Sequence, residues 1–247
     1  MDNERKDKNY FGEMTAYEQR FAQYESTGAF AALMRNVYVW MTLALAITGM
    51  TAYYVSMNPG WMQAIAENTL LFWGLIIGEL AIVIMLTARI HKMSFMTAGA
   101  MFGLYSILNG VTMSFIFLAY TATSIATTFF ITAGTFAAMS FVGFFTKKDL
   151  STFGRIALMA LIGLIIATLV NMFMQSSMLS LIISYVGVLI FVGLTAYDTQ
   201  KIKMMLLQYG TERNDTTMKI ALMGSLALYL DFINLFLYLL RIFGNRD

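Results

Sequence analysis

Seven runs of mainly apolar residues, separated by short polar breaks, decide what this chain can fold into. Each has about 20 residues, the length at which a helix crosses the hydrocarbon core of a bilayer. Backbone N–H and C=O groups find no partner in lipid, so such a run spans as a helix that satisfies its own backbone. The sequence therefore predicts an all-α membrane protein with seven transmembrane helices. The predicted spans are Val37–Val55, Leu70–Ala88, Phe95–Tyr120, Ser124–Thr146, Phe153–Met174, Met178–Tyr197 and Ile220–Leu240.

Composition fits this prediction and excludes several kinds of chemistry. The chain is 59% hydrophobic and only 12% charged, which is far more apolar than a soluble domain. It has no cysteine and a single histidine, His91, so it offers no disulfide and no ligand cluster for zinc. Its basic residues lie in short clusters between the apolar runs, a pattern typical of membrane topology and not of nucleic-acid binding. We expect no cofactor and no nucleic-acid partner.

The distribution of lysine and arginine predicts the orientation in the membrane, because cytoplasmic loops collect these residues. Residues 1–36 then form a cytoplasmic tail, and residues 37–247 form the transmembrane domain with its C-terminus outside. Arg241 and Arg246 oppose this placement of the C-terminus. His91, in one of the basic loops, either contacts lipid headgroups or senses cytoplasmic pH. Basic residues occur in the tail and in every second loop, as Arg20, Arg35, Arg89, Lys92, Lys147, Lys148, Arg155, Lys201, Lys203, Arg213 and Lys219.

The last apolar run carries a carboxylate near its centre, Asp231. An ionised aspartate at the middle of a spanning helix costs about 2.5 to 3.5 kcal/mol on insertion scales, so it normally faces the interior of a bundle or water. Helical spacing places Gly224, Ala227, Asn234 and Tyr238 on the same face as Asp231. We interpret this face as a polar seam and the rest of the helix as a packing or lipid surface.

A second aspartate, Asp198, ends the apolar run of the sixth span, and the residues after it favour a helix that continues to Gly210. Asp198 precedes Gly210 by nearly as many residues as Asp231 follows Met218. In an antiparallel hairpin both acids then lie roughly 18 Å from the loop, at 1.5 Å per residue, where they can meet. The alternative is that Asp198 lies at the cytoplasmic interface and pairs with Lys201 or lipid headgroups.

The third span carries a stripe of small residues, which lets another helix approach closely. We predict helix packing for this stripe and no chemistry. Its members are Gly99, Gly103, Ser106, Gly110 and Ser114.

Two segments around the aspartates resemble a known family. Residues 193–201 read GLTAYDTQK, and residues 228–244 read LYLDFINLFLYLLRIFG. Both are similar to signature segments of the Bax inhibitor family, in its bacterial YccA-like branch. The resemblance implies seven helices with the seventh helix central, in the bacterial inner membrane. It also implies a pH-sensitive, calcium-permeable leak that is latched by a pair of aspartates.

By motif, that pair falls on Asp198 and Asp231. The resemblance also implies an acidic and a basic residue on the second helix in the same polar cluster, for which Glu79 and Arg89 are the candidates. Asn234 and Tyr238 either line the path or satisfy buried polar groups.

A physical mechanism links the two aspartates to pH. Two carboxylates in a low dielectric cannot both be ionised at small cost, so they share one proton. The shared proton ties the sixth and seventh spans together, and its loss leaves two anions that repel each other and attract cations. Calcium prefers about six to eight oxygen ligands. Asp198 and Asp231 would therefore hold calcium transiently, as a permeant ion and not as a bound cofactor.

Two other functions remain open. The protein is alternatively an adaptor that binds and modulates a membrane protease or the secretion machinery without transport. An intramembrane aspartyl protease also uses two aspartates on neighbouring helices, and Tyr197-Asp198 matches the first half of its pattern. Asp231 lacks the flanking glycine of the second half, and no proline follows Pro59. We therefore expect a protein that is not an enzyme.

Overall fold

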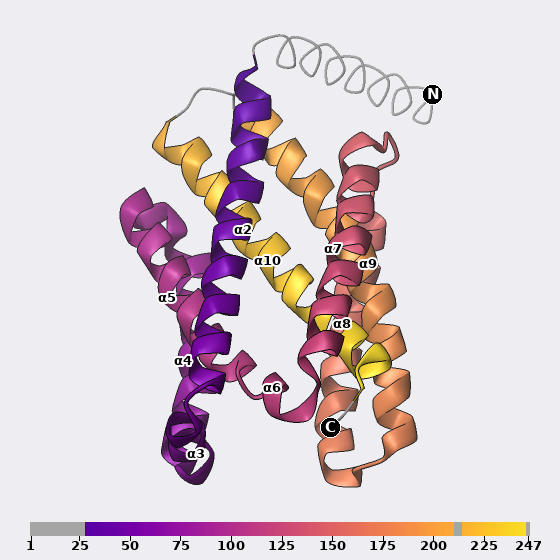
Figure 1. The fold of residues 1–247 in the computed structure, drawn as a ribbon. Coiled ribbons are helices and arrows are strands. Elements are labelled where there is room, and N and C mark those ends of the chain that lie inside the picture. Colours follow the sequence, from indigo (N-terminus) through magenta and orange to yellow (C-terminus); the bar gives the residue numbers. More distant parts are fainter. Residues whose placement is uncertain (1–27, 210–213, 246–247) are drawn as a thin grey trace.

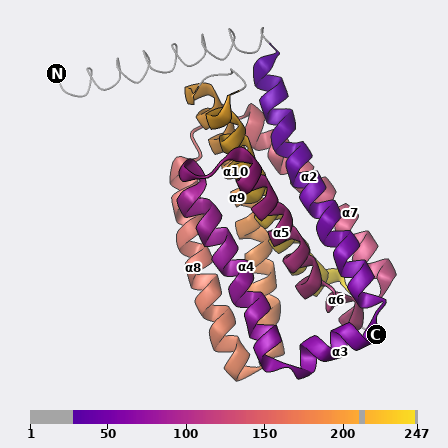
Figure 2. The ribbon, with the colours of Figure 1, turned by 90° about the vertical axis from the view of Figure 1, so that its left-hand side faces the viewer.

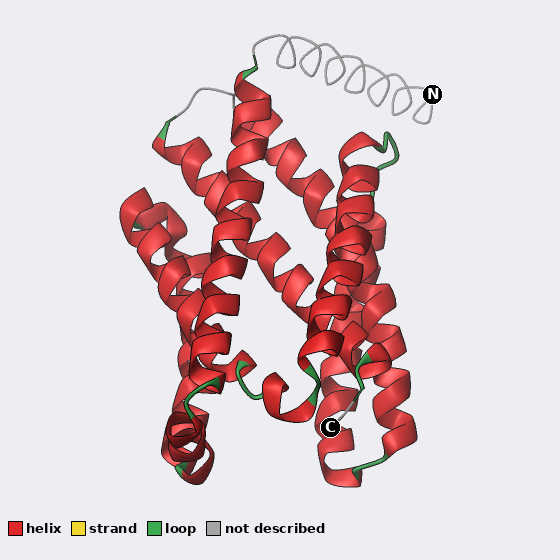
Figure 3. Ribbon diagram, viewed as in Figure 1, coloured by secondary structure: helices red, strands yellow, loops and turns green. Residues whose placement is uncertain are grey.

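The structure is a computed structural model that describes residues 28–209 and 214–245. Over these ranges the chain forms helices joined by short connections, without strands (Figure 3). Seven helices are long and apolar enough to cross a membrane, which confirms the predicted fold class. They are α2, Ala29–Ser56; α4, Thr69–Arg89; α5, Phe95–Met113; α7, Ala122–Phe145; α8, Ser151–Met174; α9, Ser177–Tyr209; and α10, Asp215–Phe243.

Three of these helices extend at least five residues beyond one end of the predicted spans. Helix α2 begins at Ala29 and not at Val37, and α9 runs on to Tyr209, as its helix-favouring sequence predicts. Helix α10 begins at Asp215 because Asn214 and Thr217 form a reciprocal capping box before it. Most of the predicted cytoplasmic tail, together with Arg20, Arg213 and Arg246, lies outside the described residues.

Short helices shape three of the connections. The only proline of the sequence starts α3, Pro59–Glu67. Proline suits the first helical position because its missing N–H has no intrahelical partner there. Figure 2 shows α3 running across one end of the bundle between α2 and α4. The third predicted span bends after Met113 into α6, Ile116–Ala119, and the 3-10 helix Ile90–Lys92 joins α4 to α5.

Helix α10 is the central helix of the bundle. Of its most apolar stretch 72% is buried, against no more than 44% for any other span. It crosses diagonally between α2, α4 and α5 on one side and α7, α8 and α9 on the other (Figure 1). It packs against α9, α2, α7 and α5. The faces of α10 that the sequence assigns to packing or lipid are thus packing surfaces.

The connections divide between the two ends of the bundle. Toward the top of Figure 1 lie the start of α2, the α4–α5 and α7–α8 connections, and the adjoining ends of α9 and α10. At the other end lie α3, α6 and the α8–α9 connection. The described basic residues that predict the cytoplasmic side, such as Arg89, Lys92, Lys147 and Lys148, all belong to the first end. The fold thus gathers these charges at one end, as a single membrane crossing by each span requires.

The small-residue stripe of α5 packs against α2, as predicted. A Cβ atom at Gly110 would lie 2.7 Å from the backbone oxygen of Thr48, and one at Gly99 would lie 3.3 Å from the Trp40 ring. Ser106 and Ser114 are fully buried. Gly103 differs, because no atom lies within 4 Å of the position of its absent Cβ. The stripe therefore works mainly as a contact surface for α2.

Candidate functional site

The structure brings Asp198 of α9 and Asp231 of α10 together, with their carboxyl groups within hydrogen-bonding reach of each other. Asp231 is only 5% exposed, and its Oδ2 atom is buried without a hydrogen-bond partner among the described residues. Asp198 is half-buried. Two carboxyl groups this close form a hydrogen bond only when at least one of them carries a proton. The contact agrees with the matched depth of the two acids in the sequence.

Close packing on both sides of the pair holds α9 against α10. A Cβ atom at Gly224 of α10 would lie 2.8 Å from Ile202 Cγ1 of α9. On the other side of the pair, a Cβ atom at Gly187 of α9 would lie 2.7 Å from the Tyr238 ring of α10. The two glycines permit an approach that brings the short aspartate side chains into contact.

The two lysines that follow Asp198 have different environments. Lys201 is exposed, with its Nζ atom 5.8 Å from the centre of the Tyr197 ring. It acts electrostatically on Asp198, but no ion pair joins these two described residues. Lys203 is buried and donates a hydrogen bond of 2.7 Å to the Phe144 carbonyl oxygen at the end of α7. A cation at a helix C-terminus is favoured by the exposed carbonyl groups there.

The four residues predicted to support the pair form no hydrogen bond or ion pair with it in the described part of the chain. Arg89 is exposed and forms no hydrogen bond or ion pair with any described residue. Asn234 donates to the Leu230 carbonyl oxygen of its own helix, and Tyr238 stacks on Phe191. Asn234 and Tyr238 thus make local contacts, which is one of the two alternatives that the sequence left open for them.

Glu79 instead belongs to a second polar cluster, because α4 packs on α5 and not on α9. Asn109 Nδ2 and Thr112 Oγ1 of α5 donate to its two carboxylate oxygens over 3.2 and 2.8 Å. The chain of contacts continues from Asn109 to the Tyr229 hydroxyl of α10, over 2.9 Å, and on to Thr48 of α2, over 2.7 Å. These hydrogen bonds connect four spans.

The hydrogen-bonded cluster around Glu79 was not predicted from the sequence. Its only signals were the single asparagine Asn109 in the middle of an apolar run and the tyrosine Tyr229 two residues before Asp231. Both are polar groups that lose hydrogen bonds to water on burial and so need partners. The sequence did not reveal which helices provide them.

The chain is similar to proteins of a known family. Residues 31–247 match the family described as inhibitor of apoptosis-promoting Bax1. The chain belongs to the Bax inhibitor family. It is 51% identical to the inner membrane protein YbhL of Escherichia coli K12 over 86% of this chain and 91% of that protein. A protein of Borreliella burgdorferi is 46% identical, over 86% and 91%. A membrane protein of Streptococcus pyogenes is 36% identical, over 86% and 92%.

The segment GLTAYDTQK, which carries much of the resemblance to the Bax inhibitor family, is a packing centre for three helices. Gly193 faces the Phe153 ring of α8, and Tyr197 lies over Gly154 of α8. The Ala196 carbonyl faces Gly143 of α7. These contacts fix the azimuth of α9 and with it the direction of the Asp198 side chain.

Polar residues of the same segment tie α9 to the α7–α8 connection. Gln200 accepts a hydrogen bond from the Leu150 N–H and donates one to the Lys148 carbonyl oxygen, over 2.9 and 2.8 Å. Within that connection, hydrogen bonds from the side chain and backbone of Ser151 lower the pKa of Asp149 below its ordinary value. Asp149 is therefore a carboxylate near the same end of the bundle that stays ionised at neutral pH.

No set of three or more His, Cys, Asp or Glu side chains in the described part of the chain is arranged to hold a metal ion. Asp198 and Asp231 provide two carboxyl groups, fewer oxygens than the about six to eight that calcium takes. His91 is exposed in the short helix between α4 and α5. Chemically, this site offers two acids in contact between two spans, of which Asp231 is buried and Asp198 half-buried.

Proposed function

We propose that this protein is a pH-sensitive, calcium-permeable leak channel of the bacterial inner membrane, gated by the Asp198–Asp231 pair. The observation that supports the proposal best is the contact between two carboxyl groups from neighbouring spans. One of them is almost fully buried and has an oxygen without a hydrogen-bond partner in the part of the chain that the structure describes. A single ionised carboxylate inside the membrane costs free energy. Two acids that the chain keeps at this position despite that cost are candidates for a functional element.

The closed state depends on one proton. No ion pair with a described residue neutralises either carboxylate, so ionisation of both acids would place two negative charges together in a low dielectric. Lys201 acts electrostatically on Asp198 but is exposed, while Lys203 is bound to the end of α7. Glu79 lies on α4 with its own partners on α5. A shared proton therefore ties α9 to α10 and keeps the cytoplasmic mouth shut.

Loss of the proton opens the path. As pH rises, both acids become anionic and repel each other, which separates α9 from α10 near Asp198 and Asp231. The same two charges then attract a cation. Calcium would keep waters and carbonyl groups as its other ligands, because two carboxylates do not complete its shell. Weak binding of this kind suits conduction.

Calcium flux into liposomes tests the proposal. The purified protein is reconstituted in vesicles that contain a calcium indicator, and entry is measured from about pH 5 to pH 8. We expect wild-type flux to rise with pH. Asp198→Asn keeps an amide that can bond to Asp231, so the helices stay tied and the flux should no longer respond to pH. Asp231→Ala removes the deep partner and should leave the path open at every pH.

Asp149→Asn is the matched control. It removes a carboxylate at the same end of the bundle, outside the spans, whose lowered pKa keeps it ionised over the whole range. This variant should retain the pH response of the wild type. Equal flux through the wild type and both pair variants at every pH would show that the pair is no latch.

The same experiment separates the alternatives. If neither the wild type nor any variant conducts, the adaptor function becomes the leading one. An intramembrane aspartyl protease would cleave a labelled transmembrane peptide, and both pair variants would abolish that cleavage. We expect no cleavage, because Asp231 lacks the sequence context of that class.

A further inference from the structure

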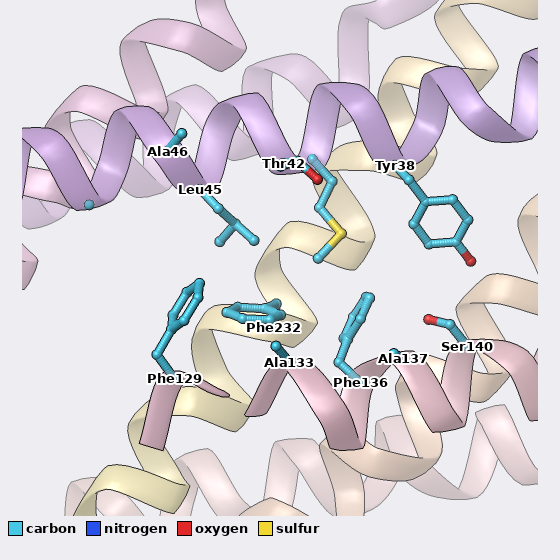
Figure 4. A pocket seen from close by; sticks show the side chains of 12 residues that line it. Tyr38, Thr42, Leu45, Ala46, Phe129, Ala133, Phe136, Ala137, Ser140 and Phe232 are labelled. Atoms are coloured by element: carbon cyan, nitrogen blue, oxygen red, sulfur yellow. The ribbon is translucent and has the colours of Figure 1, made fainter. Parts of the chain in front are cut away.

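A groove opens on the side of the bundle between α2 and α7, with α10 as its floor (Figure 4). Its volume is about 510 Å³. Met41 and Leu45 of α2, Phe129 and Phe136 of α7 and Phe232 of α10 form most of its apolar lining. Gly49 and Ala137, on the two walls, are exposed, so the groove is open to what surrounds the bundle. For a membrane-spanning chain that surrounding is lipid.

Two of the three hydroxyl-bearing side chains that line the groove lie toward one end, and the third, Thr42, lies closer to its middle (Figure 4). Tyr38 and Ser140 occupy that end, opposite Phe129 and Ala46 (Figure 4). Tyr38 is close to the start of α2 and Ser140 to the end of α7, so this is the end of the bundle where the basic residues gather. The groove is therefore amphipathic along its length, with an apolar body in the middle of the bundle and hydroxyl groups nearer its surface.

A cation lies beyond the polar end. Arg35 is one turn of α2 from Tyr38, and its spacing from Tyr38 and Thr42 places it on the groove face of the helix. Its side chain is exposed and forms no hydrogen bond or ion pair with any of the residues that the structure describes. A guanidinium group presents a planar fork of donors that matches a phosphate.

We propose that this groove binds one acyl chain of a phospholipid, with the lipid phosphate at Arg35. An apolar cavity does not hold water readily, and an unfilled one loses dispersion contacts along its whole lining. The volume lies within the about 300 to 1,000 Å³ of ligand pockets. A helix about 10 Å across needs on the order of 400 Å³ for each turn. The groove would thus hold little more than one turn of a partner helix, but it fits a single flexible chain.

The bound chain would touch the helix that carries the acid pair. Phe232 is the floor of the groove and follows Asp231 directly in α10. The ring of Phe232 packs edge-on against Phe129 and Phe136 of α7, with ring centres 5.4 and 5.5 Å apart. A lipid in the groove therefore supports the α7–α10 contact, and it does so whether or not the protein conducts calcium.

Native mass spectrometry of the purified protein tests this inference. The protein in detergent is titrated with dioleoyl phosphatidylglycerol, and the bound lipids are counted. We expect one tightly bound lipid on the wild type. Gly49→Leu fills the groove without a clash, since no atom lies within 4 Å of a Cβ at Gly49, and it should lose this lipid. Arg35→Gln should weaken binding roughly fivefold, because a basic side chain at the membrane surface contributes about 1 kcal/mol.

Matched variants keep the test specific. Gly134→Leu is the control for Gly49→Leu, because Gly134 is a helical glycine with the same free space but does not line the groove. Arg155→Gln is the control for Arg35→Gln. Both controls should retain the lipid, and Ala137→Trp should lose it while Ala138→Trp retains it.

Three results would overturn the proposal. The first is unchanged lipid binding by both groove-filling variants, Gly49→Leu and Ala137→Trp. The second is equal binding of dioleoylglycerol, which has the same chains but no phosphate. The third is unchanged lipid binding together with loss of a dimer in the filled variants, which would make the groove a seat for a second copy of the chain.

Discussion

Two polar residues of α10, Tyr229 and Asp231, connect the central helix to opposite halves of the bundle. Two residues along a helix correspond to a rotation of about 200° around its axis, so the two side chains point to nearly opposite sides. Tyr229 is fully buried and bonds to Thr48 and Asn109, on α2 and α5. Asp231 faces Asp198 on α9. The first contact is a neutral hydrogen-bond network that holds in any protonation state of the pair, whereas the second depends on a proton. At the residue scale, α10 thus has one contact that does not depend on the protonation of the pair, its constant attachment, and one contact that does.

Tyr229→Phe tests the constant attachment. The substitution leaves Asn109 without its hydroxyl donor in a buried place, which should lower the free energy of unfolding by about 1 to 3 kcal/mol. Tyr105→Phe is the control, because Tyr105 packs on the same ring, 5.7 Å away, and its hydroxyl has no hydrogen bond among the described residues. That variant should differ from the wild type by less than about 0.5 kcal/mol. Unfolding in mixed micelles measures both, and an equal loss in the two variants would contradict this role.

At the scale of the helices, α7 and α9 approach each other most closely where a glycine permits it. A Cβ atom at Gly143 would collide with the backbone of Ala196, whose carbonyl oxygen faces it. Nearby, the Thr199 hydroxyl donates to Ser140 over 3.4 Å, and Lys203 reaches the last turn of α7. The close contact places Asp198 against α10, because it sets the position of α9 relative to the rest of the bundle.

Gly143→Ala should force these two helices apart. We expect a loss of about 1 to 3 kcal/mol in the free energy of unfolding, as for overpacking in a well-packed interior. Gly134→Ala, on the same helix, has free space around the new methyl group and should lose nothing or gain up to about 1 kcal/mol. Equal stability of the two variants, measured by the same unfolding assay, would show that the α7–α9 contact adapts without cost.

The sequence predicted what depends on one helix or on one hairpin. The spans follow from the length of the apolar runs. The matched depth of Asp198 and Asp231 made their contact possible, and the family resemblance favoured it over an interfacial position for Asp198. The partners of Glu79 depended on which helix lies beside α4, and no pattern within a single span records this. Asn109 looked like an isolated polar residue for the same reason. Arg89 was placed near the pair by resemblance, but the structure leaves it exposed at the end of α4.

At the scale of the whole molecule, the described basic residues of the loops lie at one end of the bundle. The acid pair is displaced toward the same end, because Asp198 lies past the middle of α9 on the side of Tyr209. The positive-inside tendency predicts that this end is cytoplasmic. With that orientation, the proposed latch would respond to cytoplasmic pH, and the proposed lipid groove would have its polar end at the cytoplasmic surface. Both proposals therefore depend on the same orientation.

Reporter fusions test the orientation. Fusions after Thr146 and after Tyr209 should report a cytoplasmic location, and a fusion after Thr121 should report an external one. These positions lie at the ends of α7 and α9 and at the start of α7, so they sample both ends of the bundle. The opposite pattern would invert the proposed orientation.

The central place of α10 has a consequence for biogenesis, because this most buried span is synthesised after the six spans that surround it. Chains grow at about 5 to 20 residues per second, so several seconds pass between the synthesis of α9 and the completion of α10. During these seconds the first six spans lack their central helix. During that time Asn109 and Asp198 lack their partners on α10, and the inner faces of α2, α5, α7 and α9 are uncovered. A chain that ends before residue 215 lacks α10, so the inner faces of the other spans stay uncovered. We expect such a chain to be a substrate for membrane quality control. We therefore expect the core of this bundle to form late, when α10 joins the six spans already in the membrane.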